Sequence, residues 1–162
     1  MLKVTIDHNI TKFSQDLRNM PIVIQKLALT AMFRAASLVE AEAKNNLRGR
    51  VLNVQSGSLF NSIQKKVGID SDGNVFSDVF STGVPYAKIH EFGGLIPAHF
   101  VAPRNKKALH WQSGGKDFFS KGHMIPDIEM PERSYLRSAL TAAAPRIEQM
   151  FASIPELAFE RI

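Results

Sequence analysis

The sequence predicts a fold that combines long helices with antiparallel β-hairpins. Apolar residues recur at helical spacing near both ends of the chain, and a turn-like DSDGN segment separates two stretches of strand character in the middle. The chain has 162 residues, 44% of them hydrophobic, and a chain of this size buries roughly 70% of the surface exposed by its unfolded form. We therefore expect one domain over residues 1–162, with a hairpin extension at about 96–130.

The N-terminal third is predicted to be mainly helical. A first strand is expected at Lys3–Asp7, then a short helix in ITKFSQDLRNM, with Asn19-Met20-Pro21 as a break. Pro21 fits the first turn of a longer helix that runs to about Leu47. Its apolar stripe consists of Ile24, Leu27, Ala28, Ala31, Ala35, Leu38 and Val39. The alanines leave little side-chain thickness, so another element, such as a sheet, can approach this face closely.

A β-hairpin is predicted next. QSGSLFNSI, Gln55–Ile63, is typical of a turn that enters a strand over Ser62–Ile69. DSDGN has the composition of a hairpin loop, with Gly73 at the position that needs positive φ, and NVFSDVFS supplies the return strand.

YAKIHEFGG, Tyr86–Gly94, places His90 next to Glu91 on a predicted helical turn. A helical zinc site needs a second histidine four residues after the first, where this chain has Gly94. No other pair of histidines lies at a ligand-like spacing of two to five residues. The sequence therefore assigns no metal site.

A structural interpretation of this turn is preferred. The residues expected to anchor the turn are Ala87, Ile89 and Phe92. The residues expected to face solvent or a neighbouring protein are Lys88, His90 and Glu91, because adjacent helical residues do not share a face. Gly93-Gly94 ends the turn. On this interpretation, His90→Ala combined with Glu91→Ala leaves the fold intact.

Residues 99–124 are basic for their length. The chain carries a formal charge of +5, and this segment has five cations against Asp117 alone. The cations are Arg104, Lys106, Lys107, Lys116 and Lys121. Such a segment can attract phosphate or an acidic protein face.

The basic segment is predicted to form a long β-hairpin. HFVAPRNKKALHW and FFSKGHMI would be its arms, joined by QSGGKD, whose two glycines suit a tight turn. The arms carry Phe100, Trp111, Phe118 and Phe119. These aromatic residues either close over the core or pack on a neighbouring subunit.

A last helix is predicted to start near Pro131. Its apolar face consists of Leu136, Leu140, Ala143, Ile147, Met150, Phe151 and Ile154. Pro145 lies within it, so we expect a kink or a break near Ala143–Pro145.

Several functional classes find no support in the sequence. There is no cysteine, which excludes disulfides and thiol catalysis and suits a reducing compartment. No nucleophile elbow, P-loop or paired histidine ligands are present, so we predict no catalytic residue, no cofactor and no metal. The N-terminus lacks the pattern of a secretory signal, and no segment is expected to span a membrane.

Three ordered motifs resemble one protein family. SGSLFNSI resembles a T/S-G-x-L-x-x-S-I segment, YAKIHEFGG a Y-A-x-x-x-E-F-G turn, and PERSYLRSAL a P-x-R-x-F-L-x-x-A segment. With the KALHW strand between the last two, they are similar to the tail-completion, or neck, proteins of long-tailed bacteriophages, which include minor tail components. The resemblance covers roughly residues 20–142. Tyr135, where phenylalanine is usual, and Pro145 depart from the pattern and affect the packing of the C-terminal helix.

The resemblance implies an α+β fold, with long N-terminal and C-terminal helices packed on a mostly antiparallel sheet and the basic hairpin added to it. It also implies a structural virion protein without catalytic activity, assembled in the host cytoplasm as a homo-oligomeric ring at the head-tail interface. Six copies would match a sixfold tail. The partners implied are the head connector and the tail terminator or tail-tube proteins, with DNA passing through the lumen and no membrane involved.

The residues expected at subunit or partner contacts come from the turn, the hairpin and the last motif. They are Tyr86, Lys88, His90, Glu91, Phe92, Arg104, Lys106, Lys107, Trp111, Lys116, Lys121, Arg133 and Arg137. An alternative is a nucleic-acid-binding accessory protein, in which the hairpin cations meet phosphates and Trp111 stacks on a base. A metal hydrolase built on His90 and Glu91 is a third hypothesis, and metal analysis of the purified protein would test it.

Overall fold

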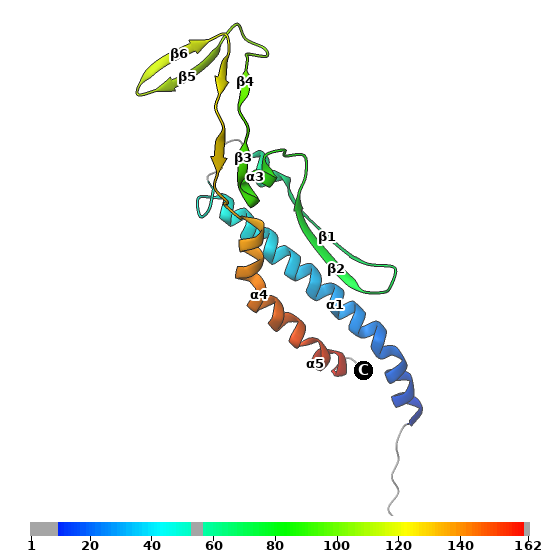
Figure 1. Ribbon diagram of the computed structural model, residues 1–162. Helices are drawn as coiled ribbons and strands as arrows, with labels where there is room; N and C mark the ends of the chain where they lie inside the picture. Colours follow the sequence, from blue (N-terminus) through cyan, green and yellow to red (C-terminus); the bar gives the residue numbers. More distant parts are fainter. Residues whose placement is uncertain (1–9, 53–56, 161–162) are drawn as a thin grey trace, which may run out of the picture. The chain divides into compact units, whose positions relative to one another are not determined.

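The computed structural model of the protein describes residues 10–52 and 57–160 (Figure 1). These residues form two compact units. Unit 1 contains the chain up to Val84 and again from Tyr135, and unit 2 is Pro85–Ser134. The strand expected at Lys3–Asp7 lies outside the described residues.

Unit 1 is built on one long helix, α1, which spans Ile10–Leu47. The prediction of two helices separated at Asn19-Met20-Pro21 is wrong, because α1 continues through Pro21. A proline removes one helical hydrogen bond. The turns that follow Pro21 are held by the packing of Leu27 and Ala31 on another helix, so the loss of that bond does not end α1.

α1 forms the middle layer of unit 1 (Figure 1). The hairpin of β1 (Ile63–Ile69) and β2 (Val75–Ser81) contacts one side of it. The helices α4 (Leu136–Ala152) and α5 (Ile154–Phe159) contact the other. Long helices with antiparallel strands confirm the α+β class.

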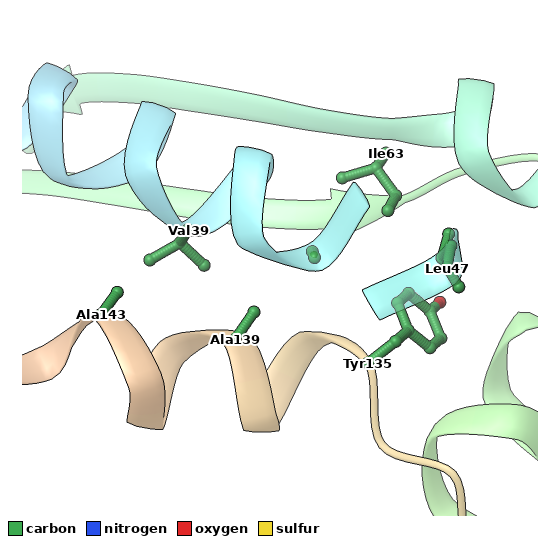
Figure 2. Close-up of a cluster of buried hydrophobic side chains, with 7 residues drawn as sticks. Val39, Leu47, Ile63, Tyr135, Ala139 and Ala143 are labelled. Atoms are coloured by element: carbon green, nitrogen blue, oxygen red, sulfur yellow. The ribbon is translucent and has the colours of Figure 1, made fainter. Parts of the chain in front are cut away.

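The core of unit 1 is rich in alanine. Figure 2 shows its main cluster of buried side chains, which consists of Val39, Ala43, Leu47, Ile63, Tyr135, Ala139 and Ala143. Because alanines of α1 and α4 face each other, no larger side chain keeps the two helices apart. The close approach that the sequence suggested for a sheet is made here by a helix. A second cluster joins Leu27 and Ala31 of α1 to Ile154 and Ala158 of α5.

The predicted stripe of α1 is largely confirmed. Leu27, Ala31, Ala35 and Val39 are buried, Ala28 and Leu38 are half-buried, and Ile24 is exposed. The part of α1 from Arg18 to Leu47 is also long and apolar enough to cross a membrane by length and composition, contrary to the expectation from the sequence. Core helices of soluble proteins and signal sequences near the N-terminus pass the same test. Here α1 contacts four other elements, β1, β2, α4 and α5, and 28% of the apolar window is buried.

The central hairpin is confirmed. β1 and β2 pair antiparallel from Ile63↔Ser81 to Ile69↔Val75, and Gly73 in the loop has φ 84°. The Asp70 carboxylate closes the loop, since its Oδ1 accepts the backbone N–H groups of Asp72 and Asn74 at 3.0 and 2.8 Å. Before β1, where a turn was predicted, the chain forms the short helix α2, Ser58–Ser62.

The C-terminal helix differs from its prediction at both ends. It begins at Leu136 and not near Pro131, because the preceding residues Ile128–Met130 form a strand of unit 2. α4 continues through Pro145 without a break, and the chain interrupts the helix only at Ser153. The buried face consists of Ala139 and Ala143, while the expected anchor Leu140 is exposed.

Asn46 fixes the start of α4 to the end of α1. Its buried side-chain Nδ2 donates to the carbonyl of Tyr135 at 3.0 Å and to Ser138 Oγ at 3.1 Å. Tyr135 itself is among the largest fully buried side chains described. The tyrosine in place of the usual phenylalanine is thus accommodated in the core.

Glu40 connects α1 to β1. Its Oε1 accepts from Lys44 Nζ at 2.6 Å and its Oε2 accepts from Lys65 Nζ at 2.5 Å. The hydrogen bonds from Lys44 and then Lys65 lower the pKa of Glu40.

Unit 2 begins with a short helix, α3 (Ala87–Phe92), as predicted, and continues as a two-stranded ribbon. β3 (Gly94–Ile96) pairs with β8 (Ile128–Met130), and β4 (His99–Val101) pairs with β7 (His123–Ile125). The two ladders share one register. Three residues after Ile96 on one strand and three residues before Ile128 on the other are His99 and Ile125, which are also paired. Pro97 and Pro126 lie in the interruption, where each lacks an N–H for the ladder.

The tip of the ribbon is the hairpin β5 (Leu109–Ser113) and β6 (Lys116–Ser120), closed by Gly114-Gly115 as predicted. The predicted arms pair antiparallel, but the pairing is interrupted. The last pair of the β4–β7 ladder is Val101↔His123, and the first pair of the β5–β6 ladder is Leu109↔Ser120. Between these two pairs, one strand of the ribbon has residues 102–108 and the other has only Lys121 and Gly122. We call residues 102–108 together with 121–122 the junction.

We predict that Asn46→Ala lowers the free energy of unfolding by about 1–3 kcal/mol, because the Tyr135 carbonyl loses a buried donor. Urea unfolding measures this change. Asn45→Ala is the control, since Asn45 is exposed on the same turn. Equal stability of both variants would contradict the role given to Asn46.

A second prediction concerns pH. The ordinary glutamate pKa is 4.5 and that of folded Glu40 is lower, so its contribution is present above 4.5 and is lost as pH falls through the folded-state value. The free energy of unfolding of Glu40→Gln should be lower than that of the wild type by on the order of 1 kcal/mol near neutral pH, and by progressively less in acid. Unfolding at several pH values tests this, with Glu42→Gln as the control, since its Arg50 partner is mostly exposed. A pH-independent difference would refute it.

Candidate protein-interaction site

Two motifs that are distant in sequence meet within unit 2. Ser134 Oγ donates to Glu91 Oε1 at 2.7 Å, and the Arg133 N–H donates to the carbonyl of His90 at 2.9 Å. Glu91 is only 5% exposed. The prediction that Glu91 faces solvent is therefore wrong, because its carboxylate holds the 131–134 segment against α3.

Gly93 permits this close approach. It has φ 67°, and a Cβ built there would lie 2.7 Å from the backbone nitrogen of Glu132 and 2.8 Å from the carbonyl oxygen of Met130. Any side chain would push the two segments apart. The β3–β8 ladder starts at the next residue, so Gly93 and Glu91 together set the base of the ribbon.

The remaining residues of the α3 turn are arranged differently from the prediction. Phe92, expected as an anchor, is 60% exposed. His90 is half-buried and lies edge-on to Tyr86 with ring centroids 5.8 Å apart. Its Nδ1 is buried and has no hydrogen-bond partner among the residues that the structure describes. Within those same residues, no three histidine or carboxylate side chains gather as metal ligands.

The ribbon tip carries stacked aromatic rings on both faces. His110 stacks on Phe119 across the strands with ring centroids 4.8 Å apart, and Trp111 stacks on Phe118 with ring centroids 5.6 Å apart. Since side chains alternate along a strand, these two pairs lie on opposite faces of the hairpin. Trp111 also contacts His123 at 5.2 Å.

These apolar side chains are open to solvent. The exposed large hydrophobic residues of unit 2 are Tyr86, Phe92, Leu95, Phe100, Trp111, Phe118, Phe119, Met124 and Ile128. Of the two alternatives for the aromatic residues, closure over a core is therefore wrong. A two-stranded ribbon has no second layer to cover them, and isolated two-stranded hairpins are marginal in water.

Asp117 is the only carboxylate of the tip. Its Oδ1 lies 2.7 Å from His110 Nε2 and accepts from Gln112 Nε2 at 2.8 Å. The His110 and then the Gln112 hydrogen bond lower the pKa of Asp117. The negative charge is therefore held on the His110 face of the hairpin.

The predicted contact residues are exposed except for His90 and Glu91. Arg104, Lys106 and Lys107 lie in the junction, with Lys121 across from them, and Lys116 lies beside the tip turn. Arg137 belongs to α4 of unit 1, so it is not part of the ribbon. Whether these residues make contacts in an assembly stays a prediction.

Sequence reasoning missed Ser134 and Asn46. Each bonds to a residue far along the chain, 43 residues away for Ser134 and 89 for Asn46 to Tyr135, so no local pattern marks them. The one local signal is a glutamate two residues before a Gly-Gly stop. Helical spacing alone does not show which face of the turn another segment covers, so the sequence wrongly predicts that Glu91 is exposed.

Comparison with known proteins gives one family. The family model described as "Bacteriophage HK97-gp10, putative tail-component" matches residues 11–93, half of the chain. The match covers α1, the β1–β2 hairpin and the α3 turn. It confirms the resemblance to phage tail proteins. Searches of curated proteins and of solved structures find no match.

We predict that Glu91→Ala loosens the base of the ribbon, because it leaves Ser134 without the buried acceptor and costs about 1–3 kcal/mol locally. Hydrogen exchange of the β3 and β8 amides should become faster. Lys88→Ala is the control, since Lys88 is exposed on the same helix. If exchange stays at the wild-type rate in both variants, the structural role of Glu91 is refuted.

Proposed function

The chain belongs to the HK97-gp10-like family of bacteriophage tail components, and we propose that it acts at the head-tail interface through the ribbon of unit 2. A tail component is part of the virion. The finer proposal is that the protein completes the tail, as a ring between the head connector and the tail-tube proteins.

The observation that carries this proposal is the distribution of buried side chains. Every buried hydrophobic residue among those described belongs to unit 1, while Glu91 is the one buried residue described in unit 2. Unit 1 can therefore fold on its own core. Unit 2 has no buried hydrophobic residue among those described, yet it exposes nine large apolar side chains over its 50 residues, against seven in the larger unit 1. Such exposed surfaces mark sites of protein interaction.

The chemistry of the tip suits a protein partner. Aromatic side chains provide large contact area with few rotatable bonds, and tryptophan is prominent among interface residues that carry most of the binding energy. Trp111 and Phe118 are stacked on each other, so little further ordering is needed when a partner covers them. The open strand edges of the ribbon offer backbone groups for additional pairing.

A ring follows from repeated contacts of this kind. If the ribbon of one copy packs on a different surface of the next copy, the contact is head-to-tail, and such contacts close into rings when the rotation allows. Six copies would match a sixfold tail. The ribbon would then contact neighbouring copies or the adjoining connector and tail-tube proteins.

The proposed role requires no chemistry. The family is one of structural components. Activity in this account consists of specific contact between proteins, without a catalytic residue or a cofactor.

We predict that Trp111→Ser combined with Phe118→Ser blocks head-tail joining while the subunit stays folded. Loss of two central aromatic contacts of about 2 kcal/mol each should lower affinity by roughly 10³-fold. Complementation of a phage extract lacking the wild-type protein measures joining, and thermal unfolding checks the fold.

The matched control is Phe159→Ser, an aromatic residue of α5 that is as exposed as Phe119. Joining at the wild-type level in the double variant would show that the tip makes no essential contact. An equal loss in the control would show that the effect is not specific to the ribbon.

A further inference from the structure

The junction of the ribbon gathers four cations at one level. Arg104, Lys106 and Lys107 lie in residues 102–108, between the last pair of the β4–β7 ladder and the first pair of the β5–β6 ladder. Lys121 lies in the two-residue segment directly across. All four side chains are exposed, and none forms an ion pair with another described residue.

The positive charge of the junction is not neutralised nearby. The only carboxylate in residues 99–124 is Asp117, and its oxygen is occupied by His110 and Gln112 on the tip hairpin. We propose that the junction binds the phosphate backbone of double-stranded DNA, independently of base sequence. This goes beyond the structural role proposed above and can be tested on the isolated protein.

Charge density favours DNA over a second copy of this chain. Residues 104–107 span on the order of 10 Å at most, so three cations fall within a length over which duplex DNA carries several phosphates. The C-terminal segment, residues 125–162, has six Asp+Glu against four Lys+Arg spread over its whole length. The most acidic stretch of a second copy, residues 67–87, has three exposed carboxylates, Asp70, Asp72 and Asp78, and no Lys or Arg. These are fewer negative charges than the roughly six phosphates that duplex DNA carries over about 10 Å.

Residue type favours DNA over another protein. Lysine is depleted in protein interfaces relative to the rest of the surface, and three of the four junction cations are lysines. The flexible lysine ammonium binds a phosphate as a point charge, without the fixed bidentate geometry of arginine. Base stacking is not required, since Trp111 already has ring contacts with Phe118 and His123.

The test is binding of a fluorescent duplex of about 30 base pairs to the purified wild-type chain over a salt series. With four phosphate contacts, log K should fall against log salt with a slope of about −3.6, or roughly 10²-fold between about 50 and about 200 mM. The chain has a single tryptophan, Trp111, which contacts His123 next to the junction. Its fluorescence should therefore change on binding.

The decisive variant is R104Q/K106Q/K107Q/K121Q, which should lose nearly all of this slope. The control is K26Q/R34Q/K88Q/R146Q, which removes the same charge from exposed positions elsewhere and should keep the slope. Thermal unfolding should be unchanged in both.

Three results would overturn the proposal. One is that DNA binding is weakened equally in both variants, which would mean that net charge alone attracts DNA. Another is the absence of salt-dependent binding by the wild type, or binding without a change in Trp111 fluorescence. The third is tighter binding of polyaspartate than of the duplex at equal charge concentration, which would identify the partner as an acidic protein surface.

Discussion

The alanine face of α1 is the constraint on which unit 1 depends. Ala43 on α1 and Ala139 and Ala143 on α4 are buried to within 1% of complete burial, so the two helices are held at a separation that only small side chains permit. A larger residue at any of these positions would have to displace a helix, and overpacking of this kind costs about 1–3 kcal/mol. The helix separation in turn positions Asn46 to bond the start of α4, and α1 carries the β1–β2 hairpin on its other side.

Unit 2 is stabilised by a different principle. Its base is joined by a buried carboxylate, a serine hydroxyl and a glycine that allows close backbone contact, without any buried hydrophobic side chain among its described residues. Polar contacts of this kind fix geometry but contribute little net stability, because each replaces a bond to water. The ribbon therefore has a defined register and an apolar surface that is exposed to solvent. This combination is what an assembly protein needs if its contacts form only with the correct neighbour.

The sequence predicted the elements whose signals are local. The α1 stripe, the 63–81 hairpin with Gly73 and the turn at Gly114-Gly115 were found because periodicity or turn chemistry specifies them within a few residues. The errors concern contacts across the chain. Pro21 and Pro145 did not break their helices, since packing on other elements holds the flanking turns. Glu91 is buried because a segment more than 40 residues later covers it, which no helical pattern could reveal. The sequence does not predict the junction. That residues 102–108 lie opposite only residues 121–122 becomes visible only when the strands are paired.

The central claim is that the ribbon tip packs on another phage protein in the assembled particle. Photo-crosslinking from position 118, with Phe118 replaced by a photoreactive phenylalanine analogue, tests it most directly. In purified particles the account predicts an adduct with a neighbouring copy or with an adjoining structural protein, identified by mass spectrometry and absent from the free subunit. Particles that contain the variant but give no protein adduct, or an adduct with DNA alone, would contradict it.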